Sequence, residues 1–213
     1  MNPPLLEVSL QLHFESAQFT EERLQYFYRL VGDLLPDSKK VPNQVACYSS
    51  IDKSSSLVLN RQLLELRSNS GISYPRLRSD WNRILSSFGD SFEVPEVQNV
   101  SLSYLNEIPL EDLQSFQNYL NISFAMPEPL EKRFEFFRSE FTYKYDFGEI
   151  KVWLQPDWDD ELENYCLQLN LQSLQSGTVS TSALSTQLQE LHDGMKDVFH
   201  QILSENFIRQ LPQ

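Results

Sequence analysis

The chain has 213 residues, of which 40% are hydrophobic and 12% aromatic, so it can bury a large core and is not expected to be disordered. Its two cysteines exclude a disulfide framework, and no apolar run approaches the roughly 18 residues of a transmembrane helix. The net charge of −13 is uneven, because residues 1–83 carry +1 and residues 84–213 carry −14. The later part is therefore expected to repel phosphate backbones and to attract basic protein surfaces. The N-terminus lacks a secretory leader pattern, which predicts a cytoplasmic protein.

The first elements are predicted by local patterns. Residues 6–14 alternate between apolar and polar, which is typical of a strand with one face in the core. Thr20 is the predicted N-cap of a helix, which Pro36 ends. The segment "DSKKVPN" that follows is predicted to be a polar connector.

The next segments predict a hairpin, a helix and a strand. A short strand at 45–49 precedes a hairpin that turns near Asn60-Arg61. The segment "YPRLRSDWNRILSSFG" predicts a helix with Pro75 in its first turn and Gly89 as its C-cap. A strand follows at 100–108, with Tyr104 and Asn106 on the same face.

The last part of the chain reads as strands followed by a helix. One or two helical turns are expected in "LEDLQSF", and residues 118–174 predict an antiparallel meander. The segment "QSGTVSTS" predicts a loop before a long helix over 183–211. An apolar stripe on that helix either docks on a sheet or pairs with another helix; it consists of Leu184, Leu188, Leu191, Met195, Val198 and Ile202. No long internal repeat is evident.

These elements predict an α+β fold with one or more antiparallel sheets and about three main helices, the long C-terminal helix packing on a strand meander. The chain forms either a single domain, 1–213, or two lobes. The first lobe would hold the strands and helices of 1–112, and the second the meander and last helix of 113–213.

The sequence contains no recognisable catalytic motif. Its six glycines are too scattered for a phosphate-binding loop, and no nucleophile elbow or zinc motif is present. His192 and His200 are eight residues apart with Lys196 between them, which is unfavourable for a metal. The acidic run "PDWDDELEN" lacks the glycine of a calcium loop and is expected to be solvated. We therefore predict no metal, no cofactor and no catalytic residue.

Residues 53–83 form the one basic stretch, with six basic and two acidic residues. Arginines interleaved with aromatic residues can bind nucleotides or single strands, so Arg67, Arg76 and Arg78 are candidate anion-binding residues. The alternative is that these arginines pair with the acidic remainder of the molecule.

Four segments resemble a sporadically distributed family of uncharacterised prokaryotic proteins: "NPPLLEVSLQLHF", the "YP" at Tyr74-Pro75, "SYLNEI" and "LHDGMKDVF". The resemblance covers nearly the whole chain. Members of that family typically carry Arg-Tyr-Ile-Asn at the end of a strand, whereas this chain has Ser103 in place of the arginine. The resemblance implies no agreed activity.

Tyr104, Asn106, His192 and Asp193 are the motif residues whose role is open. Asn106 is either part of a site or ties the turn after its strand to the sheet, and the structural role is favoured because turn-forming asparagine is common. His192-Asp193 is weak as an acid–base pair, since adjacent helical residues do not face each other.

The sequence favours a protein-interaction or regulatory module over an enzyme. An acidic surface and a long amphipathic helix suit an antitoxin-like, immunity-like or phage-defence accessory protein that binds a basic protein partner. The alternative function is nucleotide or RNA binding or processing through residues 53–83, which the overall negative charge opposes. A homo-oligomer through the 183–211 helix is a further expectation; no membrane partner is expected.

Overall fold

The computed structural model describes residues 5–15, 17–39, 44–69, 73–92, 96–110, 116–121, 138–159, 164–179 and 183–210. Four features of the sequence prediction lie partly or wholly outside these residues: the segments "LEDLQSF" and "PDWDDELEN", the first strand of the expected meander, and the boundary between the two expected lobes. The described residues confirm an α+β fold with an antiparallel sheet and a long helix after the last strand.

Nine described strands form one antiparallel sheet in the order β2-β3-β4-β5-β1-β6-β9-β8-β7. Their bounds are β1 Leu5–Phe14, β2 Asp37–Lys39, β3 Ala46–Ser49, β4 Ser55–Leu59, β5 Leu63–Asn69, β6 Val97–Pro109, β7 Ser139–Tyr145, β8 Gly148–Asp159 and β9 Asn164–Val179. The helices are α1 Glu21–Val31, α2 Tyr74–Ser91, α3 Phe116–Tyr119, α5 Leu184–Ile202 and α6 Glu205–Gln210.

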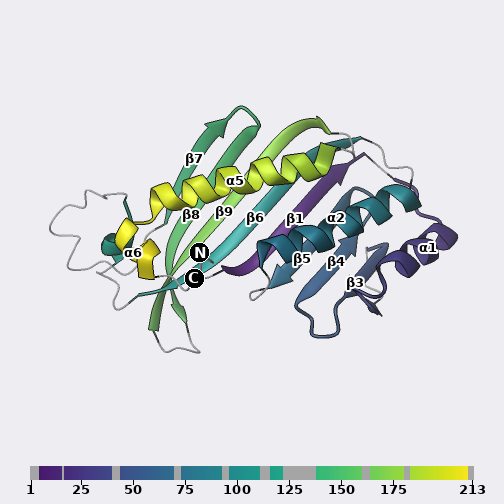
Figure 1. Cartoon of the computed structure of the whole chain (residues 1–213), viewed down its shortest axis with the longest axis horizontal. Coiled ribbons are helices and arrows are strands. Elements are labelled where there is room, and N and C mark those ends of the chain that lie inside the picture. Colours follow the sequence, from purple (N-terminus) through teal and green to yellow (C-terminus); the bar gives the residue numbers. More distant parts are fainter. Residues whose placement is uncertain are drawn as a thin grey trace.

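Helices α1, α2 and α5 lie against one face of the sheet (Figure 1). That face carries the apolar members of each alternating strand, such as Leu10, Leu102 and Leu169, which are fully buried. The apolar stripe of α5 docks there, and all six of its side chains are at most 3% exposed. The opposite face of the sheet, here called the polar face, carries serine, glutamine and asparagine side chains. Burial of one face and polarity of the other is the usual division for antiparallel sheets.

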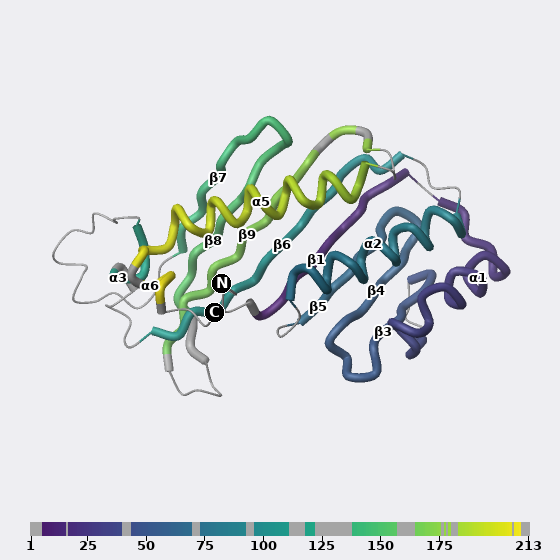
Figure 2. The backbone as a smooth tube through the Cα atoms, viewed as in Figure 1, coloured from purple at the N-terminus to yellow at the C-terminus, as the bar shows by residue number. Residues whose placement is uncertain are grey.

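The sheet is built from two similar halves, which the tube in Figure 2 makes easy to follow. In the first half β1 is flanked by β5, β4 and β3, and in the second half β6 is flanked by β9, β8 and β7. Each set of three strands is followed by a long helix, α2 or α5. Since β1 and β6 pair antiparallel at the centre, the halves are related by an approximate two-fold axis near the Leu10–Leu102 pair.

The sequence preserves traces of this duplication. Val8-Ser9-Leu10 in β1 matches Val100-Ser101-Leu102 in β6. The buried faces of the two long helices also repeat the same spacing of four, three and four residues: Leu77, Trp81, Ile84 and Phe88 in α2, and Leu184, Leu188, Leu191 and Met195 in α5. The repeat is not evident in the sequence, because the two halves share the spacing of their apolar residues and few identical residues.

Two boundaries in the first half differ from expectation. Residues 37–39, predicted to be connector, form β2 by pairing with residues 47–49, because a backbone ladder needs no apolar pattern. Gly89 is not a C-cap. The helix continues to Ser91, and the backbone N–H of Phe92 bonds the carbonyl oxygen of Phe88.

Two boundaries in the second half also differ. Strand β9 continues to Val179, through most of the predicted loop, because the long β6 offers a partner as far as Val97. The predicted 183–211 helix ends at Ile202. Leu203 forms a bridge with Leu120, and α6 follows as a separate helix.

Candidate functional site

Tyr74, Tyr104 and His192 meet between the two long helices and the sheet, and we call them the aromatic cluster. The Tyr104 hydroxyl lies 2.6 Å from His192 Nδ1. The Tyr74 ring stacks on the imidazole at a centroid distance of 3.4 Å and an interplanar angle of 7°. Three of the segments on which the predicted family resemblance rests therefore converge, from the start of α2, the middle of β6 and the middle of α5.

Burial keeps the aromatic cluster neutral. It lowers the pKa of His192 to about 4, and the Lys196 and Arg78 charges act in the same direction while Asp193 opposes them. Burial also raises the pKa of Tyr74 to about 12 and that of Tyr104 well above its usual value. At neutral pH the imidazole is therefore uncharged and both phenols keep their protons.

A chain of polar contacts beside the cluster joins α2 to α5. Arg78 Nη1 donates to Gln189 Oε1 over 2.6 Å, and Gln189 Nε2 donates to Asp193 Oδ1 over 2.9 Å. The Tyr74 hydroxyl lies 3.5 Å from the carbonyl oxygen of Leu188. Asp193 thus accepts a hydrogen bond from Gln189, one turn earlier on the same helix, and forms none with His192.

Asn106 lies within β6 rather than at its end, because the strand continues to Pro109. The side chain is 1% exposed, and its Nδ2 donates to the carbonyl oxygen of Leu169 on the neighbouring strand over 3.1 Å. Asn106 therefore does not tie a following turn to the sheet, because the strand continues beyond it. It holds β6 to β9, two residues along the same face from Tyr104.

Among the described residues, the aromatic cluster holds no activated nucleophile. A tyrosine whose pKa is raised is not an activated nucleophile, and no serine, cysteine or threonine bonds His192 among the described residues. The described residues also contain no group of three His, Cys, Asp or Glu side chains that would hold a metal ion. The arrangement can fasten two helices to the sheet.

The three candidate anion-binding arginines do not share one site. Arg67 pairs with Glu65 over 2.9 Å, and Arg78 turns toward Gln189. Arg67 and Arg76 both line a hollow of about 170 Å³, but three aspartates line it as well, namely Asp33, Asp52 and Asp80. Acidic residues beside the arginines weaken the attraction of this hollow for an anion.

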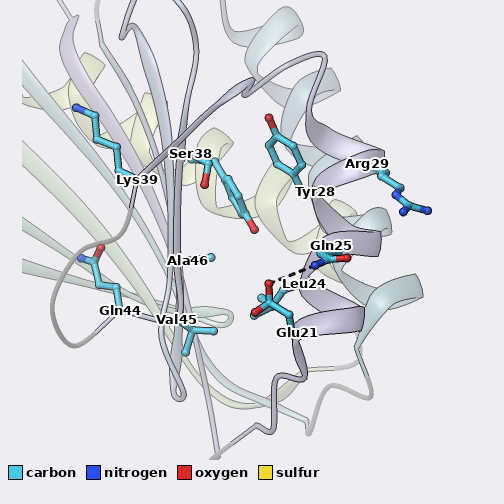
Figure 3. A pocket seen from close by; sticks show the side chains of 11 residues that line it. Glu21, Leu24, Gln25, Tyr28, Arg29, Ser38, Lys39, Gln44, Val45 and Ala46 are labelled. Carbon is cyan, nitrogen blue, oxygen red and sulfur yellow. Dashed lines mark hydrogen bonds between the residues drawn. The ribbon is translucent and has the colours of Figure 1, made fainter.

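A larger hollow of about 650 Å³ lies between α1 and the strands β2 and β3 (Figure 3). Tyr28 and Tyr48 stack beside it at 5.4 Å, and the Tyr28 hydroxyl donates to the carbonyl oxygen of Pro36. Its lining carries both signs of charge, with Glu21, Arg29 and Lys39. This mixture indicates no particular ligand class.

A third hollow, of about 410 Å³, lies on the polar face over β6, β9 and β8. Sequence reasoning missed it, although the alternation of Gln168, Asn170 and Gln172 in β9 was a visible signal. The residues that line it are Ser103, Leu105, Arg138, Trp153, Gln155, Gln168, Asn170 and Gln172.

Comparisons with known proteins give no family. No family model matches the chain, and no curated protein does. The predicted resemblance to the sporadically distributed family therefore stays a prediction. A rolling circle replication initiator protein from Geobacillus stearothermophilus aligns over 91% of this chain and 79% of its own, with 5% sequence identity and a TM-score of 0.31. Among the described residues, no helix is long and apolar enough to cross a membrane.

Proposed function

We propose that this protein is a non-catalytic interaction module that binds a partner protein with a basic surface. The charge distribution carries the proposal: residues 84–213 hold twenty-one acidic and seven basic residues. Complementary charge speeds association and selects partners, so an excess of this size favours basic proteins.

The exposed side of α5 is the proposed contact. Glu190 and Asp197 are exposed there, and Lys196 is the one basic residue beside them. The apolar side of the same helix is buried in the core, so the helix presents its charges on a rigid support. A homo-oligomer through this helix, which we keep as a proposal, would have to use the same exposed side.

We further propose a regulatory role of the antitoxin-like, immunity-like or phage-defence kind, in the cytoplasm. The acidic charge and the predicted family resemblance support the regulatory role. The neutral, internally bonded aromatic cluster supports a role without catalysis. Its residues serve to hold the two long helices on the sheet.

The test begins by recovering the protein with its partners from a prokaryotic host at low salt, and then reconstituting the complex from purified components. We expect a basic protein in stoichiometric amount, with an affinity that falls as salt screens the charges. The double variant Glu190→Lys/Asp197→Lys should weaken that binding. The control Glu22→Lys/Asp90→Lys makes the same change in net charge at exposed positions in the first half and should leave it near the wild-type value. An affinity that is the same at low and high salt, and in both double variants, would contradict the proposal.

A further inference from the structure

We propose that the polar-face hollow binds a nucleotide, with the base on Trp153 and the phosphate on Arg138. The proposal goes beyond the partner binding described above, because the hollow lies on the face of the sheet opposite α5. At about 410 Å³ the hollow falls in the range of roughly 300–1,000 Å³ that is usual for small-molecule sites.

The charge of the hollow is unusual for this chain. Arg138 is the only charged residue among the eight that line it, although the chain as a whole carries −13. Arg138 forms no ion pair with any described residue. A guanidinium that pairs with no carboxylate of the described residues suits phosphate, which it can bind through two parallel hydrogen bonds.

The floor of the hollow is shaped by one row of side chains across three strands. Asn170 of β9 lies between Leu105 of β6 and Trp153 of β8, its direct partners in the ladders. A small amide between two larger side chains leaves a depression. Trp153 supplies an aromatic surface on which a base can stack, and such stacking is largely independent of base identity.

Primary amides supply the hydrogen bonds that a base edge requires. Four of the eight lining residues are amides: Gln155, Gln168, Asn170 and Gln172. Asn170 Oδ1 is buried, and no described residue donates to it. A buried acceptor without a partner is unfavourable, so an N–H group of a base is a fitting donor.

The equivalent place in the first half of the molecule is filled. Glu65 of β5 lies opposite Gln11 of β1. It corresponds to Gln172 of β9, which lies opposite Ser103 of β6. Glu65 is 7% exposed, and its Oε1 accepts from Gln11 at 2.8 Å, from Arg67 at 2.9 Å and from Ser9 at 3.3 Å. Glu65 is thus bonded internally, and Gln172 Nε2 likewise donates to Ser101 Oγ over 3.1 Å. The difference lies beside Gln172, where no described residue donates to Asn170 Oδ1.

The test is a titration of the purified full chain followed by tryptophan fluorescence, with 5′-mononucleotides, the matching nucleosides, ribose 5-phosphate, inorganic phosphate and a short single-stranded oligonucleotide as probes. We expect saturable binding of mononucleotides that is tighter than that of nucleosides or ribose 5-phosphate. Tighter binding of the oligonucleotide would identify a strand as the source of the nucleotide, and tighter binding of the mononucleotide would identify a free nucleotide.

Variants locate the site. Arg138→Gln should weaken mononucleotide binding about tenfold or more and leave nucleoside binding unchanged, since it removes a charged hydrogen bond. Trp153→Leu should weaken both and remove the fluorescence signal. Lys144→Gln, an exposed position on β7, the strand that begins directly after Arg138, is the matched control and should behave as wild type. Circular dichroism checks that each variant folds. Failure of every mononucleotide to bind, or wild-type affinity in Arg138→Gln, would overturn the proposal.

Discussion

The hydroxyl of Tyr104 and Nδ1 of His192 lie 2.6 Å apart although 88 residues separate them in the chain. Their contact joins the central strand β6 to helix α5. Tyr74, the first residue of helix α2, stacks on the imidazole and so joins α2 to the same contact. Tyr104 is buried and His192 is half-buried, so loss of either partner leaves a polar group in a poorly solvated place.

Tyr104→Phe should lower the free energy of unfolding by about 1–3 kcal/mol, because it leaves Nδ1 of His192 without its partner. Urea denaturation followed by circular dichroism measures the change. Tyr26→Phe is a suitable control, since Tyr26 is 48% exposed and should tolerate the change. Equal stability of the two variants would mean that the hydrogen bond adds nothing to the fold.

Stability should fall as the pH drops from about 6.5 to about 4, in part because of His192. Its pKa is about 4 in the folded protein, mainly through burial, against 6.5 for an ordinary histidine. In this window the unfolded chain binds the proton and the folded one does not, which favours unfolding. The contribution is fully present above pH 6.5 and is lost as the pH falls through the folded pKa.

The pH effect is measured as the difference in unfolding free energy between wild type and His192→Gln at several pH values. The difference should shrink as the pH falls from 6.5 to 4, since glutamine cannot bind the proton. A constant difference would show that His192 titrates alike in both states. The carboxylates titrate in both proteins, so their effects largely cancel.

Asn106→Ala should lower the melting temperature while leaving partner binding intact. The change leaves the carbonyl oxygen of Leu169 without its side-chain donor in the core, which costs about 1–3 kcal/mol. Asn99→Ala, on the other face of the same strand and only partly buried, serves as the control. Loss of binding with unchanged stability would instead place Asn106 in a functional site.

Leu188→Glu and Met195→Glu should each prevent folding, because these side chains are 3% and 0% exposed. Burial of an unpaired carboxylate costs several kcal/mol, a large part of the roughly 5–15 kcal/mol that stabilises most domains. Thr186→Glu, on the exposed side of α5, should fold normally. Circular dichroism and size-exclusion chromatography distinguish the outcomes. Folded monomers from either core variant would show that the stripe is an oligomer contact.

Replacing two helical glycines, Gly194 and Gly89, by alanine should change the free energy of unfolding in opposite directions. A Cβ at Gly194 would lie 2.6 Å from Cζ of Phe147 and 3.2 Å from Cδ1 of Ile150, so Gly194→Ala should destabilise by about 1–3 kcal/mol. A Cβ at Gly89 meets nothing within 4 Å, and Gly89→Ala should stabilise by about 0.5–1 kcal/mol. Thermal denaturation of the pair checks both signs. Equal shifts would mean that α5 does not pack closely on the β7–β8 turn.

Local patterns in the sequence determined a large part of the fold. The alternation in 6–14 defined β1, Asn60-Arg61 marked the turn between β4 and β5, and the apolar stripe of 184–202 defined α5. These features were readable because strand and helix periods depend on neighbouring residues alone. The same reasoning missed β2 and extended the last helix past Ile202, where pairing with distant segments sets the boundary.

Only the tertiary structure decided which distant residues meet. Tyr104 and His192 were singled out separately in the sequence, yet their contact depends on α5 crossing β6. The polar-face hollow depends on Leu105, Asn170 and Trp153 falling in one row across three strands. Strand order and register arise from packing of the whole sheet, and a one-residue shift in register would reverse every side chain. The sequence therefore determined the elements of this protein, and the packing of its two halves decided the sites.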